Sequence, residues 1–452
     1  MACHPGVTAP DTVAEPGAVR SGPYHPRAAA RRGSDGKLRV RDATAMAVGG
    51  MIGGGIFSVL GVGITLAGHL AFGTFVIGGA IAALTAKSFA GVTARAGTSG
   101  GPFDHLRQQG HTELAGMLLW LLVFGYMVAM AVYSFTFGHY VADAFGAPAW
   151  FARAATVAII AAFLAINLRG VRLSSLAEDL IVLTKLAILG GIGIIGLVSF
   201  TPARLAPMAD TGIGGMFLGA ATVFFAYEGF ELICYDRDDM VDPARTLPRS
   251  LYLSVAIVAA VYIGVTLGSQ MLVADNVLAA DKAVAFVAVG RAALGEPGRW
   301  AAIIGAAFAT GSAINATLFS CARLIRDASR TGDLPPALGH ETNGLPVVAM
   351  AFISIVGAAM AMLPGITTVI VFGSAAFLVI YMIVNGLQAT MAPSRAARRT
   401  ATVAAVACLA AIGALIVELA RDDPRGLAIL AGIASGIALA RYAFVRTSQE
   451  PG

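Results

Sequence analysis

The sequence predicts an all-α polytopic membrane protein with twelve membrane-spanning helices. Of the 452 residues, 57% are hydrophobic and only 13% are charged, and the mean hydropathy is +0.77. A soluble chain of this length needs a far more charged surface. Apolar runs long enough to cross a bilayer recur along the whole chain, which excludes an unusually apolar soluble protein.

The first 42 residues differ from the rest of the chain. They are rich in Ala, Pro, Gly and Arg, and they lack the apolar core of a signal peptide. We therefore expect residues 1–42 to form a disordered cytoplasmic tail. The positive charge of this tail helps to orient the protein in a membrane and does not imply a nucleic acid partner.

Twelve apolar runs, bounded by charges, Pro or Gly, follow the tail. They are 43–67, 71–95, 113–143, 150–168, 176–199, 212–235, 249–273, 299–325, 345–363, 366–391, 401–420 and 426–446. With the N-terminus inside, most of the 31 Lys and Arg residues fall on the cytoplasmic side. We expect a multi-pass protein of the cell membrane with both termini in the cytoplasm.

The first run contains "AVGGMIGGGIF", residues 47–57, and five of these eleven residues are glycine. Glycine is the poorest ordinary helix former after proline. A broken helix is tolerated in lipid only where protein or a water-filled cavity covers it, and its half-helix ends then attract ions. The pairs Gly49–Gly53 and Gly50–Gly54 also fit the GxxxG packing motif, so this segment alone favours packing and binding equally.

The sixth run contains "FFAYEGFE", with Glu228 and Glu231 on either side of Gly229. Carboxylates inside a membrane are costly and usually face a cavity or the bundle interior. The alternative is a structural role, in which the acids pair with a hydroxyl or cation or are protonated in the core. A glycine between two acids favours a second interruption of a helix.

The two interrupted runs start five helices apart. A repeat with an odd number of helices places the next repeat in the membrane with the opposite orientation. Residues 43–199 and 212–391 would then form two inverted repeats of five helices, with both breaks together at the midplane. The helices of residues 401–446 would lie outside the repeats.

Lys185 in "IVLTKLAILGGIG" is a third unusual feature, about three turns into the fifth run. A lysine near a helix end can extend its amine to the membrane surface. This is the alternative interpretation of Lys185, and it is the favoured interpretation of Lys87. A buried lysine that gains and loses a proton could stand where other transporters bind sodium.

Several segments resemble, in order, the amino acid–polyamine–organocation superfamily of permeases. "GGMIGGGIF" resembles the broken first helix of that family, and "FFAYEGFE" followed by "DPARTLPRSL" resembles its sixth helix and next loop, with Asp242 where Asn is usual. Similar matches are "LTAKSFAGVTARAGTSGGPFDHL" (84–106), "INLRGVRLSS" (166–175) and "INATLFSCARLIRDASRTGDLPPALG" (314–339). Together they cover about residues 40 to 395.

The resemblance implies a LeuT-like fold that moves amino acids or related amines by alternating access. The implied substrate site consists of Ile52, Gly53, Gly54, Gly55, Phe225, Ala226, Tyr227, Glu228 and Gly229. Backbone at residues 52–55 would hold the substrate carboxylate, and the carbonyls of residues 225–227 would hold its α-amino group.

The resemblance also implies roles in coupling. Lys185 matches the fifth-helix lysine of proton-coupled members and would replace sodium near helices one and eight. Glu231 would tie helix six to its surroundings and take part in gating. Thr310, Ser312 and Asn315 on helix eight would face the ion-site region.

Glu228 departs from the family, in which many members have an apolar residue at this position. Its carboxylate could pair with a cationic side chain or amine, carry a proton, or point away from the cavity. We expect broad amino acid specificity, with cationic amino acids or polyamines as the second reading.

The function expected from these features is secondary active transport, with proton-coupled uptake ahead of exchange or export. A channel or a receptor-like sensor is a different class, separable by counterflow measurements. A membrane enzyme is the weakest reading, because clustered His or Cys ligands and a nucleophile elbow are missing from the sequence. We expect no cofactor and no metal; the partners are the substrate, protons and the lipid bilayer.

Overall fold

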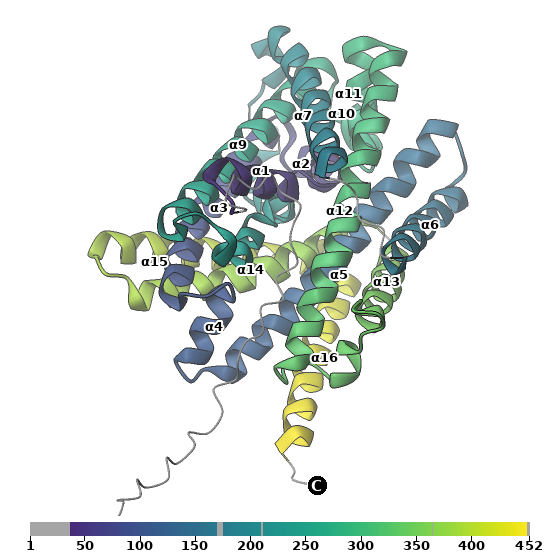
Figure 1. Cartoon of the computed structure of the whole chain (residues 1–452). Coiled ribbons are helices and arrows are strands. Elements are labelled where there is room, and N and C mark those ends of the chain that lie inside the picture. The colour runs from purple at the N-terminus through teal and green to yellow at the C-terminus, as the bar shows by residue number, and fades with distance from the viewer. Residues whose placement is uncertain (1–36, 170–174, 209–210, 364, 450–452) are drawn as a thin grey trace, which may run out of the picture.

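The computed structural model describes residues 37–169, 175–208, 211–363 and 365–449 (Figure 1). These residues form helices, joined by short connections that include two isolated β-bridges. Residues 1–36 of the tail expected at 1–42, and part of the motif at 166–175, lie outside the described residues, while α1 begins at Val40.

The helices follow one another with short connections. The α-helices of the described residues are α1 Val40–Met51, α2 Gly55–Ala67, α3 Ala71–Ala96, α4 Gly101–Gln108, α5 Thr112–Phe145, α6 Ala149–Leu168, α7 Ser175–Val198, α8 Gly212–Val223, α9 Pro243–Leu272, α10 Asp275–Ala280, α11 Ala285–Leu294, α12 Glu296–Arg330, α13 Val347–Ala361, α14 Ile366–Met391, α15 Arg395–Asp422 and α16 Pro424–Gln449. The 3₁₀ segments are η1 Gly68–Leu70, η2 Pro202–Leu205, η3 Phe224–Tyr227, η4 Phe230–Asp239 and η5 Pro336–Gly339.

Ten helical segments of the described residues are long and apolar enough to cross a membrane. An all-α polytopic membrane protein is therefore confirmed. Each of the twelve expected runs coincides with helix, but the first is divided into α1 and α2, and the ninth corresponds to the shorter α13. The number of twelve spans stays a prediction.

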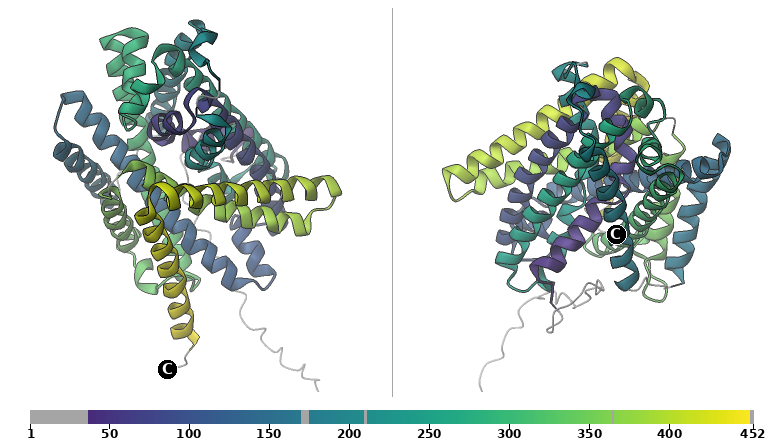
Figure 2. Two further views of the ribbon diagram at one scale, coloured as in Figure 1. Left: turned by 180° about the vertical axis from the view of Figure 1, so that it is seen from behind. Right: turned by 90° about the horizontal axis from the view of Figure 1, so that it is seen from above.

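The interior of the molecule is formed mainly by α5, α8, α14 and α3, which bury most of their apolar surface. The helices α6, α15 and α16 are peripheral and bury little. In both views of Figure 2, α15 projects sideways from the rest of the molecule.

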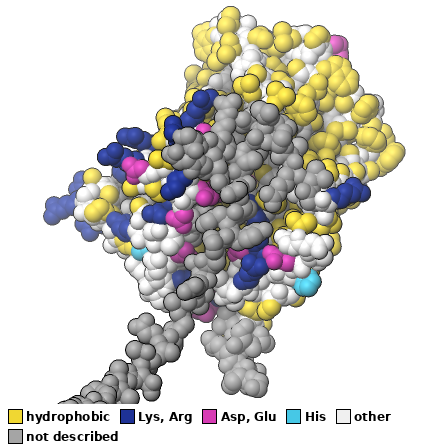
Figure 3. All heavy atoms as spheres, in the orientation of Figure 1, with side chains coloured by type: hydrophobic (Ala, Val, Ile, Leu, Met, Phe, Trp, Pro, Cys, Tyr) yellow, Lys and Arg dark blue, Asp and Glu magenta, His cyan; other side chains and the backbone are white. Residues whose placement is uncertain are grey.

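Many exposed side chains of the outer helices, α7 included, are apolar, as a lipid-facing surface requires. Examples are Leu183 and Ile194 on α7 and Val406 and Leu409 on α15. Figure 3 shows hydrophobic side chains over the upper right of one face, and most charged side chains along its left edge and around its middle. In water such apolar patches would promote association, whereas lipid covers them at no cost.

The loop after α12 is tied to three other elements through Asp333. The Asp333 carboxylate accepts from Arg107 of α4 at 2.5 Å and from Thr331 at 2.8 Å, and it lies 3.9 Å from Arg441 of α16. Its backbone carbonyl accepts from Trp120 of α5 at 2.7 Å and from Arg441 at 2.9 Å. One buried residue thus connects α4, α5 and α16.

Replacing this carboxylate removes a charge shared by Arg107 and the buried Arg441, which then keep only Asp104 and the exposed Glu113 as acidic partners. We expect Asp333→Asn to lower the free energy of unfolding by about 1–3 kcal/mol, measured as a lower melting temperature in detergent. The matched control is Glu296→Gln, which removes an exposed pair with Arg291 and should change stability by less than about 0.5 kcal/mol. Equal losses in the two variants would contradict this assignment.

Candidate functional site

The first predicted break is present between α1 and α2. The α-helix ends at Met51, where Ile52 turns to φ −81° and ψ 55°, and helix resumes at Gly55. All residues from Met51 to Gly55 are buried. The first N–H groups of α2 have no acceptor within their own helix, so this buried end is a place where a negative group is stabilised.

The second break lies at Glu228 and Gly229. After α8 the chain tightens into η3, Glu228 is extended, and Gly229 adopts φ +100° before η4 begins. This φ lies in the left-handed region, where a Cβ is disfavoured and glycine is not. The glycine that the sequence places between two acids is therefore the residue that turns the backbone.

The two breaks touch each other through glycine. A Cβ built on Gly229 would lie 3.4 Å from the carbonyl carbon of Gly50, and one built on Gly55 would lie 3.1 Å from the Cα of Ala226. The distance at Gly55 is tighter than most Cβ contacts, whereas at Gly229 the positive φ, and not the space, favours glycine. The structure thus brings the predicted residues 52–55 and 225–229 together in one buried region.

Tyr262 of α9 connects both breaks and was missed by the sequence reasoning. Its hydroxyl lies 2.8 Å from the Met51 carbonyl and 3.1 Å from the Ala226 carbonyl. The phenol has one proton for two acceptors, so it fully satisfies one carbonyl at a time. A buried tyrosine on an apolar helix signals that it has an acceptor, but its partner cannot be read from the sequence.

Ser374 of α14 forms hydrogen bonds with the backbone just before the second break. Its hydroxyl accepts from the Phe225 N–H at 3.0 Å and donates to the Thr222 carbonyl at 2.7 Å. This residue was also missed, because a lone serine in an apolar run usually bonds to its own helix.

Glu231 is surrounded by donors. Its carboxylate accepts from the Gly229 N–H at 2.9 Å, from Tyr381 of α14 at 2.6 Å and from Tyr126 of α5 at 3.4 Å. The side chain is almost fully buried. It therefore links the left-handed turn to two interior helices.

Glu228 has a different environment. Its Oε1 accepts from the Tyr133 hydroxyl of α5 at 2.6 Å, while Oε2 is buried and has no hydrogen-bond partner among the described residues. The Tyr133 ring in turn packs on the first break, 2.6 Å from a Cβ built on Gly54.

Lys185 lies on α7 with its side chain fully buried. The amine donates to the Gly49 carbonyl at 3.0 Å, two residues before α1 ends. The amine thus lies against α1 and does not extend to a membrane surface. Lys87, in contrast, is exposed and lies 3.5 Å from Thr400.

The α12 residues separate onto different faces. Thr310 packs against the first break, 2.9 Å from a Cβ built on Gly54. Asn315 instead accepts from Asn167 of α6 at 2.8 Å. Ser312 is half-buried.

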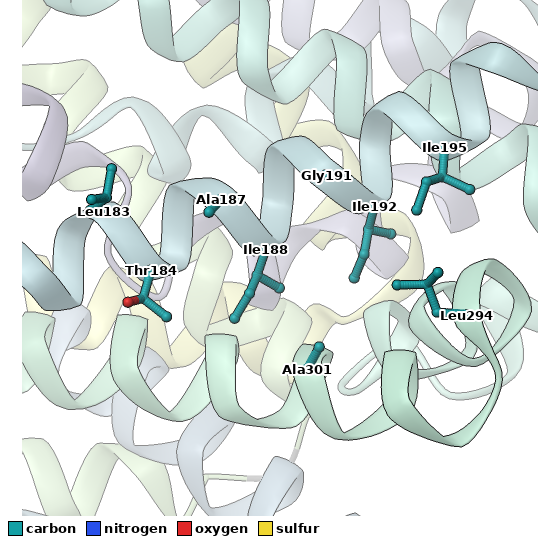
Figure 4. Close-up of a pocket in the computed structure, with 9 residues that line it drawn as sticks. All are labelled: Leu183, Thr184, Ala187, Ile188, Gly191, Ile192, Ile195, Leu294 and Ala301. Carbon is teal, nitrogen blue, oxygen red and sulfur yellow. The ribbon is translucent and has the colours of Figure 1, made fainter.

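An apolar groove of about 460 Å³ lies elsewhere, along α7. Ile188 and Ile192 of α7 point toward Ala301 of α12 and Leu294 of α11 (Figure 4). Its lining includes no residue of either break and offers almost no polar group, so it suits lipid rather than an amino acid.

Known proteins are similar in sequence to this chain over most of its length. An uncharacterised protein of Methanocaldococcus jannaschii is 32% identical, over 77% of this chain and 81% of its own. The inner membrane transport protein YbaT of Escherichia coli is 28% identical, over 77% and 82%. The large neutral amino acids transporter small subunit 2 of Mus musculus is 30% identical, over 72% and 66%.

Among solved structures, a manganese transporter of Eremococcus coleocola has a similar fold. The TM-score is 0.54 at 13% sequence identity, covering 89% of this chain and 92% of the transporter. A family model described as amino acid permease matches residues 38–432. The chain therefore belongs to the amino acid permease family and is a membrane transport protein, not an enzyme.

Proposed function

We propose that this protein is a secondary active transporter that takes up amino acids across the cell membrane by proton-coupled alternating access. The single observation that carries this function is the contact between the two helix breaks. Half-helix ends buried at one place provide N–H groups for an anion and carbonyl groups for a cation, which are the two charged groups of an amino acid.

In the proposed architecture twelve helices span the membrane, and both chain termini lie in the cytoplasm. Residues 43–199 and 212–391 form two LeuT-like inverted repeats, and residues 401–446 add two helices outside them. Support comes from the interruption of the first helix of each repeat and from the contact between the interruptions.

The substrate carboxylate binds the backbone at residues 52–55, and the site is completed by residues 225–229. Both segments are buried, and in this proposal the arrangement is a closed state of the transport cycle. Opening requires α1 or η4 to move, and Glu231 couples such movement to α5 and α14 through its tyrosine partners.

Proton coupling is assigned to Lys185. Its protonated amine holds the last turn of α1 through the Gly49 carbonyl, where a sodium ion could otherwise neutralise carbonyl groups. A neutral amine would hold this turn less tightly, so protonation and the position of α1 are linked. Thr310 packs beside the same break and is the helix-eight residue of this proposal, whereas Asn315 bonds to Asn167 of α6.

An exchanger or exporter of cationic amino acids or polyamines is the second candidate. The buried carboxylate of Glu228 favours it, because a cationic side chain would neutralise this group. Exchange would require internal substrate and would ignore the proton gradient.

Uptake into proteoliposomes tests the proposed function. We expect saturable uptake of radiolabelled amino acids, competition within a panel of amino acids and polyamines, and stimulation by an inward proton gradient. Gly229→Ala places a side chain on a left-handed residue where the two breaks touch, which costs about 1–2 kcal/mol, so uptake should fall about five- to thirtyfold. Gly190→Ala on α7 has open space around it and should retain uptake. Equal activity of the two variants would contradict a site at the breaks.

Lys185→Ala tests the coupling. We expect the proton gradient to stop stimulating uptake in this variant, because the titratable contact with α1 is gone. Lys87→Ala is the matched control and should keep its response to pH, since that amine is exposed. Wild-type uptake with unchanged pH dependence in Lys185→Ala would exclude this residue from coupling.

A further inference from the structure

The two buried glutamates of the second break differ in how many hydrogen bonds they receive. Glu231 accepts from one backbone N–H and two tyrosine hydroxyls. Glu228 accepts from Tyr133 through Oε1, and its Oε2 has no partner among the described residues, although the side chain is only 5% exposed. A buried carboxylate oxygen without a donor is costly, so Glu228 is the acid with a binding position to fill.

Three backbone carbonyls at the breaks face a donor from within the protein. The Phe225 carbonyl accepts from the Glu228 N–H at 3.2 Å. The Ala226 and Met51 carbonyls face the Tyr262 hydroxyl. A substrate ammonium group, which carries a full charge, therefore finds its strongest unsatisfied acceptor on a side chain and not on the backbone.

The position of Tyr133 sets the distance between this carboxylate and the first break. Its Cζ lies 3.8 Å from a Cβ built on Gly53, and its hydroxyl lies 2.6 Å from Glu228 Oε1. The carboxylate is therefore within about 8 Å of the glycines. An α-amino acid can bridge this distance, with its ammonium group hydrogen-bonded to Glu228 and its carboxylate hydrogen-bonded to the backbone at the glycines. The side-chain ammonium of lysine lies much farther from its own carboxylate and would not fit between them.

We propose that the Glu228 carboxylate binds the α-ammonium group of the transported amino acid, with Tyr133 as the residue that positions it. This inference rests on the proposed function, because it takes the substrate carboxylate to lie at residues 52–55. It makes the α-ammonium group the required feature of the substrate and leaves the side chain to be recognised elsewhere. Carboxylic acids that lack this group, such as α-hydroxy acids, are rejected because Glu228 is then left unpaired.

The test compares substrates that differ in one group. Uptake of radiolabelled L-leucine and L-alanine into proteoliposomes is competed with the same amino acid, with its α-hydroxy analogue (2-hydroxy-4-methylpentanoate or lactate) and with L-lysine. Glu228→Gln keeps the size of the side chain and removes its charge. We expect its KM for both neutral amino acids to rise about 10- to 100-fold, while inhibition by the hydroxy acids is kept or strengthened, because the unpaired charge that rejects them is gone.

Matched variants separate binding from folding. Glu418→Gln changes another buried carboxylate, on α15, which accepts from Thr222 of α8 at 3.3 Å, and it should keep the wild-type preference for amino acid over hydroxy acid. Glu228→Asp restores the charge and should recover part of the preference. Tyr133→Phe should show an intermediate loss of the preference for amino acid over hydroxy acid. This preference is a ratio, so it does not depend on the amount of folded protein.

The outcomes are distinct. An unchanged preference in Glu228→Gln, or a loss of L-lysine recognition with L-leucine and L-alanine unaffected, would overturn the α-ammonium assignment; the second result would move the carboxylate to a side-chain pocket. Wild-type protein that carries no amino acid would instead overturn the proposed function.

Discussion

The requirement that buried peptide groups find partners governs this structure. In a membrane an unpaired N–H or C=O group has no water to turn to, so an interrupted helix is stable only where other groups replace the missing bonds. Here the replacements come from three other helices: Tyr262 from α9, Ser374 from α14 and Lys185 from α7. The glycines allow two such interruptions to lie against each other. The packing of the interior helices around them follows from this need as much as from apolar burial.

The breaks could be predicted because they leave marks in the sequence. Glycines at 53–55, and a glycine between Glu228 and Glu231, are conspicuous in apolar runs. The hydroxyl partners could not be predicted, because α9 and α14 are apolar on most sides and no pattern shows which face meets the breaks. The division of the α12 residues was in part predictable: at 3.6 residues per turn, Thr310 and Asn315 cannot share one face of a helix. The structure indeed turns Asn315 toward α6.

Two carboxylates three residues apart have different surroundings because the backbone changes direction between them. Glu231 follows the left-handed Gly229, and its carboxylate folds back to accept from the Gly229 N–H. This places the carboxylate next to its tyrosine partners. Glu228 precedes the turn in an extended conformation and reaches α5. The same residue type thus serves as an anchor on one side of the turn and as an incompletely bonded acceptor on the other. A sequence pattern of two acids does not distinguish these roles, whereas the conformation of one glycine does.

The backbone contact between Gly50 and Gly229 has a consequence for how this protein can change during evolution. A Cβ added to Gly50 would meet the Gly229 carbonyl oxygen at 3.6 Å, and one added to Gly229 would meet the Gly50 carbonyl carbon at 3.4 Å. Substitutions at two positions in direct contact are in general not additive. We therefore expect the effect of a larger residue on α1 to depend on the residue at the turn before η4, although the two positions lie far apart in the sequence.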